Sequence, residues 1–323
     1  MSTKLITISA ALLCLFFSGA VPAQAQYPIR PIKMIVANGP GSAADAMARL
    51  LSDALRQDLK TDVIVENKAG ATGLVGGDFV AKSKPDGYTV GLFQASLLTT
   101  AAAINPNLPY DPTKDFTPLA NVGVNALALI VSSSSRWNTL DQFLKDAKQN
   151  PGKRTCGIIG TGSHSQFNLE LLEMASGTQV TRVPYSGGTG EVITGLLGGH
   201  IDCASLVWAG ISGQVRSGKF RALAVTSRIK DLATIPTFAE AGVPRASLEV
   251  FVGIFGPAHL PKRITDRLVP SLEHVIQDPK MVANMDKLGF TVAYEGPQQL
   301  AERIQKELVV VRDVAAKAGI KQE

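Results

Sequence analysis

Short apolar runs alternate with longer stretches in which apolar residues recur every three or four positions, from about residue 32 to residue 225. The runs predict buried strands, and the periodic stretches predict helices with one apolar face. The first series predicts strands at 32–37, 63–66 and 88–93, and helices from Ser42 and over 74–82. Three strands joined by two helical crossovers indicate a parallel sheet.

A second series in the same order follows a stretch rich in Pro, Asn and Asp at 105–118, which we expect to be a long loop. This series predicts one or two strands at 119–131, a helix at 139–148, a strand at 155–159 and a helix from Ser163. The alternation of strands and helices continues through the segments 180–183, 192–197, 201–206 and 223–225. A strand at 249–255 and two helices, after Pro261 and from Pro297, are expected to complete the chain.

This alternation predicts the α/β class with two lobes, each a doubly wound mixed sheet flanked by helices. We expect lobe 1 in residues 26–120 and 250–323, lobe 2 in residues 121–249, and hinge segments near 116–126 and 225–250. A cleft between two such lobes is the usual place for a small ligand.

The N-terminal segment has the layout of a secretory signal peptide. Lys4 precedes an apolar run at 5–17, and Ala23-Gln24-Ala25 has the small residues of a cleavage site. The alternative is a membrane anchor, which the run disfavours because it is shorter than the roughly 20 residues that span a bilayer. We therefore expect residues 1–25 to be removed on export, leaving a mature chain that begins at Gln26.

The composition argues against several classes of protein. Apolar residues make up 45% of the chain, which argues against disorder, and the net charge is only +5 with no basic run. Aromatic residues make up 6%, so neither a basic nor an aromatic platform for nucleic acid is expected. Three cysteines are too few for a disulfide scaffold or a multi-cysteine metal site. Cys14 falls in the removed segment, while Cys156 and Cys203 are either two separate buried thiols or a pair.

No motif for catalysis, for a metal or for a cofactor is present. The zincin, nucleophile-elbow and P-loop patterns are absent, and the four histidines are scattered. Gly160-Thr161-Gly162 starts like a dinucleotide fingerprint, but its sixth position is Ser165, where Gly or Ala is required. His164 beside Ser163 is the only nucleophile–base neighbourhood, and adjacent residues at a helix start point apart. We expect no enzyme, no metal and no cofactor.

Two glycine-rich loops occupy equivalent places in the two series. Asn38–Asp45 and Gly160–Ser165 each lie between a strand and a helix. Ser42 with Asp45, and Ser163 with Gln166, predict helix capping. Free N–H groups at a helix start bind anions, and glycine lets a ligand approach the backbone. The alternative is that the glycines merely make tight turns.

A carboxylate is expected between the backbone of Gly41–Ala43 and that of Gly162–His164. The candidate ligand-binding residues are Asn38, Gly41, Ser42, Ala43, Ser96, Thr161, Gly162, Ser163, His164, Tyr185 and Trp208. Tyr185 and Trp208 follow predicted strands and could wall the cleft or belong to the lobe core. Asp45 is expected to cap its helix rather than to contact the ligand.

The chain resembles the Bug extracytoplasmic solute receptors, relatives of the receptor of the tripartite tricarboxylate transporter, over nearly all of its mature length. The resemblance rests on the order and spacing of Tyr27–Ile32, Pro40–Asp45, Val65–Ala71, Lys84–Thr89, Leu108–Pro112, Val183–Gly187, Arg221–Thr226, Pro236-Thr237 with Glu240–Gly242, and Ala318–Lys321. This chain departs from the family pattern at Asn38, Ser42, Gln166 and Ser186, so the identity of the solute does not carry over.

The resemblance implies a two-lobed periplasmic binding protein of the type II kind that closes on a small carboxylated organic solute. It also implies delivery of that solute to a membrane permease of the tripartite tricarboxylate type. A periplasmic ligand sensor and a periplasmic enzyme that uses the same cleft are the alternatives. We expect a monomer with no nucleic-acid partner.

Overall fold

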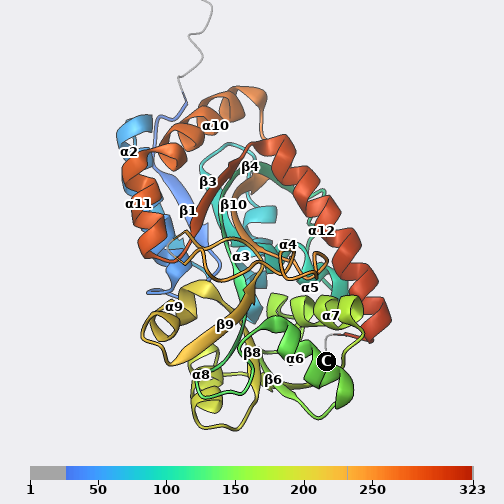
Figure 1. The fold of residues 1–323 in the computed structure, drawn as a ribbon. Coiled ribbons are helices and arrows are strands. Elements are labelled where there is room, and N and C mark those ends of the chain that lie inside the picture. The colour runs from blue at the N-terminus through green and yellow to red at the C-terminus, as the bar shows by residue number, and fades with distance from the viewer. Residues whose placement is uncertain (1–26, 231, 322–323) are drawn as a thin grey trace, which may run out of the picture.

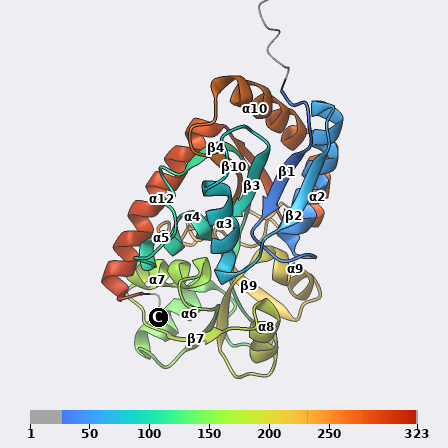
Figure 2. The same cartoon turned by 180° about the vertical axis from the view of Figure 1, so that it is seen from behind.

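The computed structural model describes residues 27–230 and 232–321 (Figure 1). The expected signal peptide and its cleavage site lie outside these residues. Two β-sheets organise the described chain, and helices cover both faces of each sheet (Figures 1 and 2). The predicted α/β class with two mixed sheets is confirmed.

The first sheet has six strands in the order β11-β4-β10-β3-β1-β2. Its strands are β1 (Ile32–Val36), β2 (Val63–Asn67), β3 (Thr89–Gln94), β4 (Phe116–Asn125), β10 (Val250–Pro257) and β11 (Thr291–Glu295). β1 pairs with β2 and β3 in parallel, whereas β10 pairs antiparallel with both β3 and β4. Its helices are α2 (Ala43–Leu59), η1 (Ala71–Gly73), α3 (Leu74–Ala81), α4 (Ala95–Leu98), α5 (Thr100–Ile104), α10 (Lys262–Gln277), α11 (Pro279–Lys287) and α12 (Pro297–Ala318).

The second sheet has five strands in the order β7-β6-β8-β5-β9. Its strands are β5 (Leu127–Ser132), β6 (Thr155–Ile159), β7 (Thr181–Tyr185), β8 (Cys203–Val207) and β9 (Phe220–Val225). Its helices are α6 (Leu140–Gln149), α7 (His164–Ser176), α8 (Thr189–Leu197) and α9 (Trp208–Arg216). β6 pairs in parallel with β7 and β8, whereas β5 is antiparallel to β8 and β9. We call the parts built on the first and second sheets the first and second lobes.

The chain passes between the sheets twice. The apolar run predicted as one or two strands is two strands in different sheets, separated by Ala126. β4 stays in the first sheet to Asn125, beyond the boundary expected at residue 120. The return passage is the segment between β9 and β10.

The loop expected at 105–118 is shorter than predicted, because β4 already begins at Phe116. The helices α4 and α5 were not predicted from the sequence. They have four and five residues, too few for an apolar periodicity to be visible. They matter because they carry the chain from the end of β3 toward the second lobe.

Both faces of each sheet are buried. On β1, Met34 and Val36 pack into the cluster beneath α2 and α10, while Ile35 packs on the opposite face with residues of α12. In the second lobe, Phe143 of α6 and Ile211 of α9 belong to separate clusters on the two faces. Strands buried on both faces explain why the strand signal is a continuous apolar run.

Helix α12 spans both lobes, as Figures 1 and 2 show. Its first half packs on the first sheet through Leu300, Ile304 and Leu308. In its second half, Val311, Val314 and Ala315 share a buried cluster with Phe167 and Leu171 of α7. The two lobes therefore share a buried apolar contact in addition to the connecting strands.

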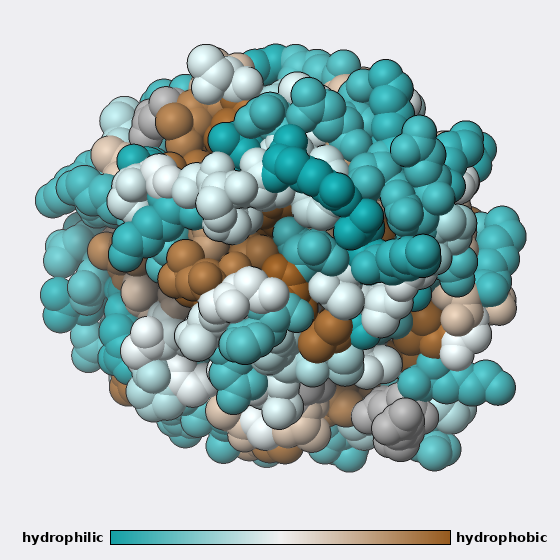
Figure 3. All heavy atoms as spheres, turned by 60° about the horizontal axis from the view of Figure 1, so that its bottom comes forward, coloured by the Kyte–Doolittle hydropathy of each residue, from teal (hydrophilic) through white to brown (hydrophobic). Residues whose placement is uncertain are grey.

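The face of the molecule seen from below in Figure 1 carries mostly hydrophilic side chains, with hydrophobic ones in several separate areas (Figure 3). Among residues 27–230 and 232–321, no helix combines the length and the apolar character needed to cross a bilayer.

Candidate functional site

The first glycine-rich loop links β1 to α2 and has a defined hydrogen-bond pattern. Gly41 adopts a φ of +80°, which favours glycine. Ser42 is the N-cap, and its Oγ accepts a hydrogen bond from the N–H of Asp45 at 3.2 Å. The Asp45 carboxylate in turn accepts from the N–H of Gly41 at 3.0 Å. The predicted capping is confirmed, with the side chain of Asp45 bonded to the residue before the cap.

Asp45 is 4% exposed but fully partnered. Arg49 donates from Nε and Nη2 to its two oxygens at 3.1 Å each, and Asn67 Nδ2 donates to Oδ1 at 2.9 Å. Asn67 Nδ2 also donates to the carbonyl of Asn38 at 3.0 Å. The Arg49 guanidinium, followed by the Gly41 N–H and the Asn67 amide, lowers the pKa of Asp45 to about 2, although burial opposes this. Asp45 is thus an ionised structural group of the loop.

The second loop, between β6 and α7, has the same pattern. Gly162 adopts a φ of +78°, and Ser163 is the N-cap whose Oγ accepts from the N–H of Gln166 at 3.3 Å. Gln166 Oε1 accepts from the N–H of Gly162 at 2.8 Å. The two loops are therefore the same capping structure, Gly-Ser-x-x-Asp in one lobe and Gly-Ser-x-x-Gln in the other.

This hydrogen-bond pattern determines which backbone N–H groups of the two loops are already used within the loop. The N–H groups of Gly41 and Gly162, expected from the sequence to hold a ligand, donate instead within their own loops. The first two helical residues of each helix have no intrahelical acceptor for their N–H groups. These residues are Ala43 and Ala44 in α2, and His164 and Ser165 in α7.

The second loop packs against the first lobe. A Cβ placed on Gly162 would lie 2.1 Å from Ile104 Cδ1, at the end of α5. His164 is 5% exposed, and its Nε2 lies 3.0 Å from Oε1 of Glu307 on α12. The same oxygen accepts from Thr99 Oγ1 at 2.6 Å. The His164 side chain is therefore occupied by an interlobe contact, which the sequence interpretation did not anticipate.

The remaining candidates in the first lobe and the second loop lie at strand ends. Asn38 follows β1, and Ser96 is half-buried in α4 after β3. Because β1 and β3 run parallel, these residues lie at the same edge of the first sheet. Thr161 is exposed in the second loop. These positions remain candidates for ligand contact.

Tyr185 and Trp208 are placed in the body of the second lobe. Trp208 is 3% exposed in the cluster of α8 and α9, which favours the core alternative. Tyr185 packs against the same cluster, and its hydroxyl would lie 2.4 Å from a Cβ at Gly195. Trp208 thus fits the core alternative, while the half-buried Tyr185 stays a candidate for ligand contact.

A groove of about 1160 Å³ runs along α12, lined by residues of α7, α12 and the segment 245–249, including Met174, Arg245 and Arg303. Neither glycine-rich loop lines it, so it is separate from the candidate site. Within the part of the chain that the structure describes, no cluster of three or more His, Cys, Asp or Glu is arranged to hold a metal ion.

Several contributors were not identified from the sequence: Arg49, Asn67, Thr99, Ile104 and Glu307. The equal spacing of the Gly-Ser pair from Asp45 and from Gln166 could have identified the shared cap. The others come from elsewhere along the chain, and no local pattern identifies them.

The chain is similar to a known family and to solved structures. Residues 47–320 match the model of the tripartite tricarboxylate transporter family receptor. The periplasmic binding protein BugD is 31% identical, with a TM-score of 0.75 over 92% of this chain and 100% of BugD. Rpa4515 from R. palustris, solved with adipate, is 25% identical, with a TM-score of 0.78 over 91% of this chain and 99% of that one. MatC from Rhodopseudomonas palustris, solved with malate, is 27% identical, with a TM-score of 0.73 over 89% and 99%.

Replacing Asp45 with Asn is expected to destabilise the protein in a pH-dependent way. The folded-state pKa of Asp45 is lowered to about 2 from 3.8, so its contribution is present above about pH 4 and is lost as pH falls through about 2. We expect Asp45→Asn to cost about 1–2 kcal/mol near neutral pH, and markedly less near pH 2.5. Urea unfolding at both pH values measures the difference. Asp53→Asn on the exposed face of α2 is the control, and a pH-independent difference would contradict the assignment.

Removing the His164 imidazole is expected to lower the free energy of unfolding by about 1–3 kcal/mol, because the buried Glu307 carboxylate then loses a hydrogen-bond partner and, among the residues that the structure describes, keeps Thr99 as its donor. Chemical denaturation of His164→Ala checks this. His200→Ala, at an exposed position in the second lobe, is the control and should change stability by no more than about 0.5 kcal/mol. Equal midpoints for the two variants would show that the interlobe contact contributes nothing.

Proposed function

The chain belongs to the tripartite tricarboxylate transporter receptor family, and on that premise we propose that it is an exported receptor for a small organic solute with one or two carboxylates. In this proposal the solute lies between the two glycine-rich loops, the lobes close over it, and the receptor releases it unchanged to a membrane permease. A sensor that reports the bound solute to another protein would use the same site.

The observation that carries the proposal is the pair of matching caps. Each presents two N–H groups of a first helical turn at the carboxyl end of a parallel strand. The positive end of each helix dipole adds to the attraction for an anion. Charge-assisted hydrogen bonds of this kind contribute about 1.5–3 kcal/mol each. Two such sites, one in each lobe, fit an acid that is bound by N–H groups of both lobes at once.

The ligands named for the relatives agree with this chemistry. Adipate and malate, solved with Rpa4515 and MatC, are both linear dicarboxylates. The first loop contains the ionised Asp45, which would repel an incoming carboxylate if it were unpaired. Because Arg49 and two further donors already neutralise and satisfy it, the N–H group of the exposed Ala43 can act on the solute.

The solute itself is identified by releasing it. The protein is purified from the exported fraction without added ligand, unfolded mildly, and its released small molecules are analysed by mass spectrometry. An aliphatic or aromatic acid present in equal amount to the protein supports the proposal. A neutral or cationic compound in that amount would reject it. Uptake of the labelled acid by cells with and without the receptor then separates delivery from sensing.

The binding mode is tested at Ala43, because it is exposed and is the first residue of α2. Gly162 is unsuitable, since any side chain there collides with Ile104 and disturbs the lobe contact. We expect Ala43→Asp to weaken binding of the identified acid at least about tenfold by isothermal titration, because it adds a negative charge beside the open donors. An acidic residue in a first helical turn favours the helix, so folding should be retained.

Ala43→Asn is the matched control, since it has nearly the same size and shape without the charge. We expect it to bind the acid within about threefold of the parent protein. If both variants bind equally, the carboxylate lies elsewhere. If both lose binding while their thermal midpoints are unchanged, size rather than charge limits this position, and the predicted repulsion between the charge introduced by Ala43→Asp and a carboxylate is not what weakens binding.

A further inference from the structure

The two cysteines of the mature chain lie directly opposite each other on neighbouring strands. Cys156 of β6 and Cys203 of β8 are partners in the parallel register of the second sheet. Both belong to the same buried cluster, so their side chains lie on the same face of the sheet. Each is 0% exposed, and both are present as free thiols.

This placement meets the main geometric requirement of a disulfide. Adjacent strands are spaced about 4.8 Å apart, and disulfides join Cα atoms about 4.4–6.8 Å apart. Cys203 Sγ lies 3.6 Å from the carbonyl oxygen of Thr155, the residue directly before Cys156. The register and the shared face therefore place the two side chains next to each other in the folded sheet.

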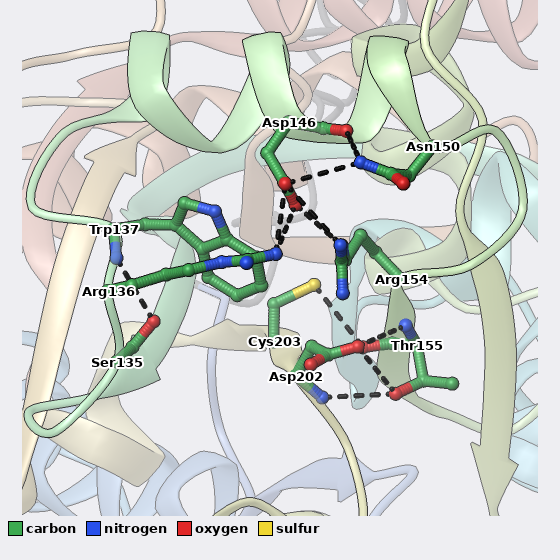
Figure 4. A network of polar contacts seen from close by, with 9 residues as sticks. All are labelled: Ser135, Arg136, Trp137, Asp146, Asn150, Arg154, Thr155, Asp202 and Cys203. Atoms are coloured by element: carbon green, nitrogen blue, oxygen red, sulfur yellow. Dashed lines mark hydrogen bonds and ion pairs between the residues drawn. The ribbon is translucent and has the colours of Figure 1, made fainter.

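The surrounding polar contacts hold the two strands in this register. Asp202 Oδ2 accepts from the N–H of Thr155 at 2.9 Å, and Thr155 Oγ1 accepts from the N–H of Asp202 at 3.1 Å (Figure 4). Next to them, Arg154 pairs with Asp146 of α6 at 2.5 Å. Each cysteine immediately follows one of the paired residues, so the alignment of the thiols is imposed by the network beside them.

We propose that Cys156 and Cys203 form an intramolecular disulfide in the exported protein. The proposal rests on the proposed export, because disulfides persist in oxidising compartments. Each thiol loses a proton, the pair gives up two electrons, and an S–S bond forms. A disulfide of a second molecule is cleaved to two thiols, which take up those protons and electrons.

The bond forms before the second sheet is complete. Burial raises the pKa of the Cys203 thiol well above its usual value, so little thiolate is available once the strands are packed. The cross-link then ties β6, which leads into the second glycine-rich loop four residues later, to the neighbouring strand β8. It stabilises the base of that loop without contacting the solute.

The test counts thiols in the protein purified from the exported fraction under denaturing conditions with an alkylating reagent. We expect no alkylated cysteine without reductant, and two after reduction, by intact mass. The Cys156→Ser and Cys203→Ser variants should each contain one alkylated thiol without reductant. Reduction of the parent protein should lower its thermal midpoint by several degrees and leave that of the Cys156→Ser variant unchanged. Two alkylated thiols in the untreated parent protein would overturn the proposal.

If the chain proves not to be exported, the proposed function as an exported receptor is wrong. A second experiment then tests the disulfide independently of export. The full chain, with Cys14→Ser to leave two thiols, is unfolded, reduced and refolded in a glutathione buffer that contains glutathione disulfide. An intramolecular disulfide, detected by the loss of both thiols without a glutathione adduct, supports the pairing. Two free thiols or two glutathione adducts reject it.

Discussion

The buried contact between α7 and α12 is the constraint on which the relation of the lobes depends. It combines an apolar cluster around Phe167 and Val311 with the His164–Glu307 hydrogen bond at 3.0 Å. Since α7 starts at the second glycine-rich loop and α12 is built on the first lobe, this contact ties the second loop to the first lobe. Any closing movement has to pivot about this contact or break it, and breaking it would leave a buried carboxylate poorly satisfied.

The two caps explain how the loops keep their shape without a bound solute. In each, the side chain at the third helical position takes up the N–H of the preceding glycine, so the strained turn satisfies its own donor. Only the first-turn donors are left for water or a solute. Because the loops already have a fixed shape, a solute that binds to them would not have to order them first. Little of the binding free energy would then be lost to conformational entropy.

Local signals in the sequence account for most of the helices and strands and for both caps, but they did not predict α4, α5, α11 or β11. Ser42 and Ser163 were identifiable because a cap involves residues three positions apart. The contact of His164 was not, because Glu307 lies 143 residues away, and Thr99, which shares the Glu307 oxygen, lies between two helices too short to show periodicity. The core position of Trp208 was likewise undecided, since a strand end is compatible with both a cleft and a core until the packing of α8 and α9 is known. Tertiary contacts, not local propensity, decide these cases.

The same contacts make the two halves of the site unequal. In the first loop, Ala43 is exposed, so its side chain can change without disturbing the packing, whereas the φ of +80° at Gly41 favours glycine although space is open there. In the second loop, Ile104 meets Gly162 and Glu307 holds His164, so a substitution there also alters how the lobes meet. In the proposed site, selectivity for different acids would therefore be adjusted more independently at Ala43 than in the second loop. There, the residues next to the proposed anion site also hold the lobes together, so a change for one purpose changes the other.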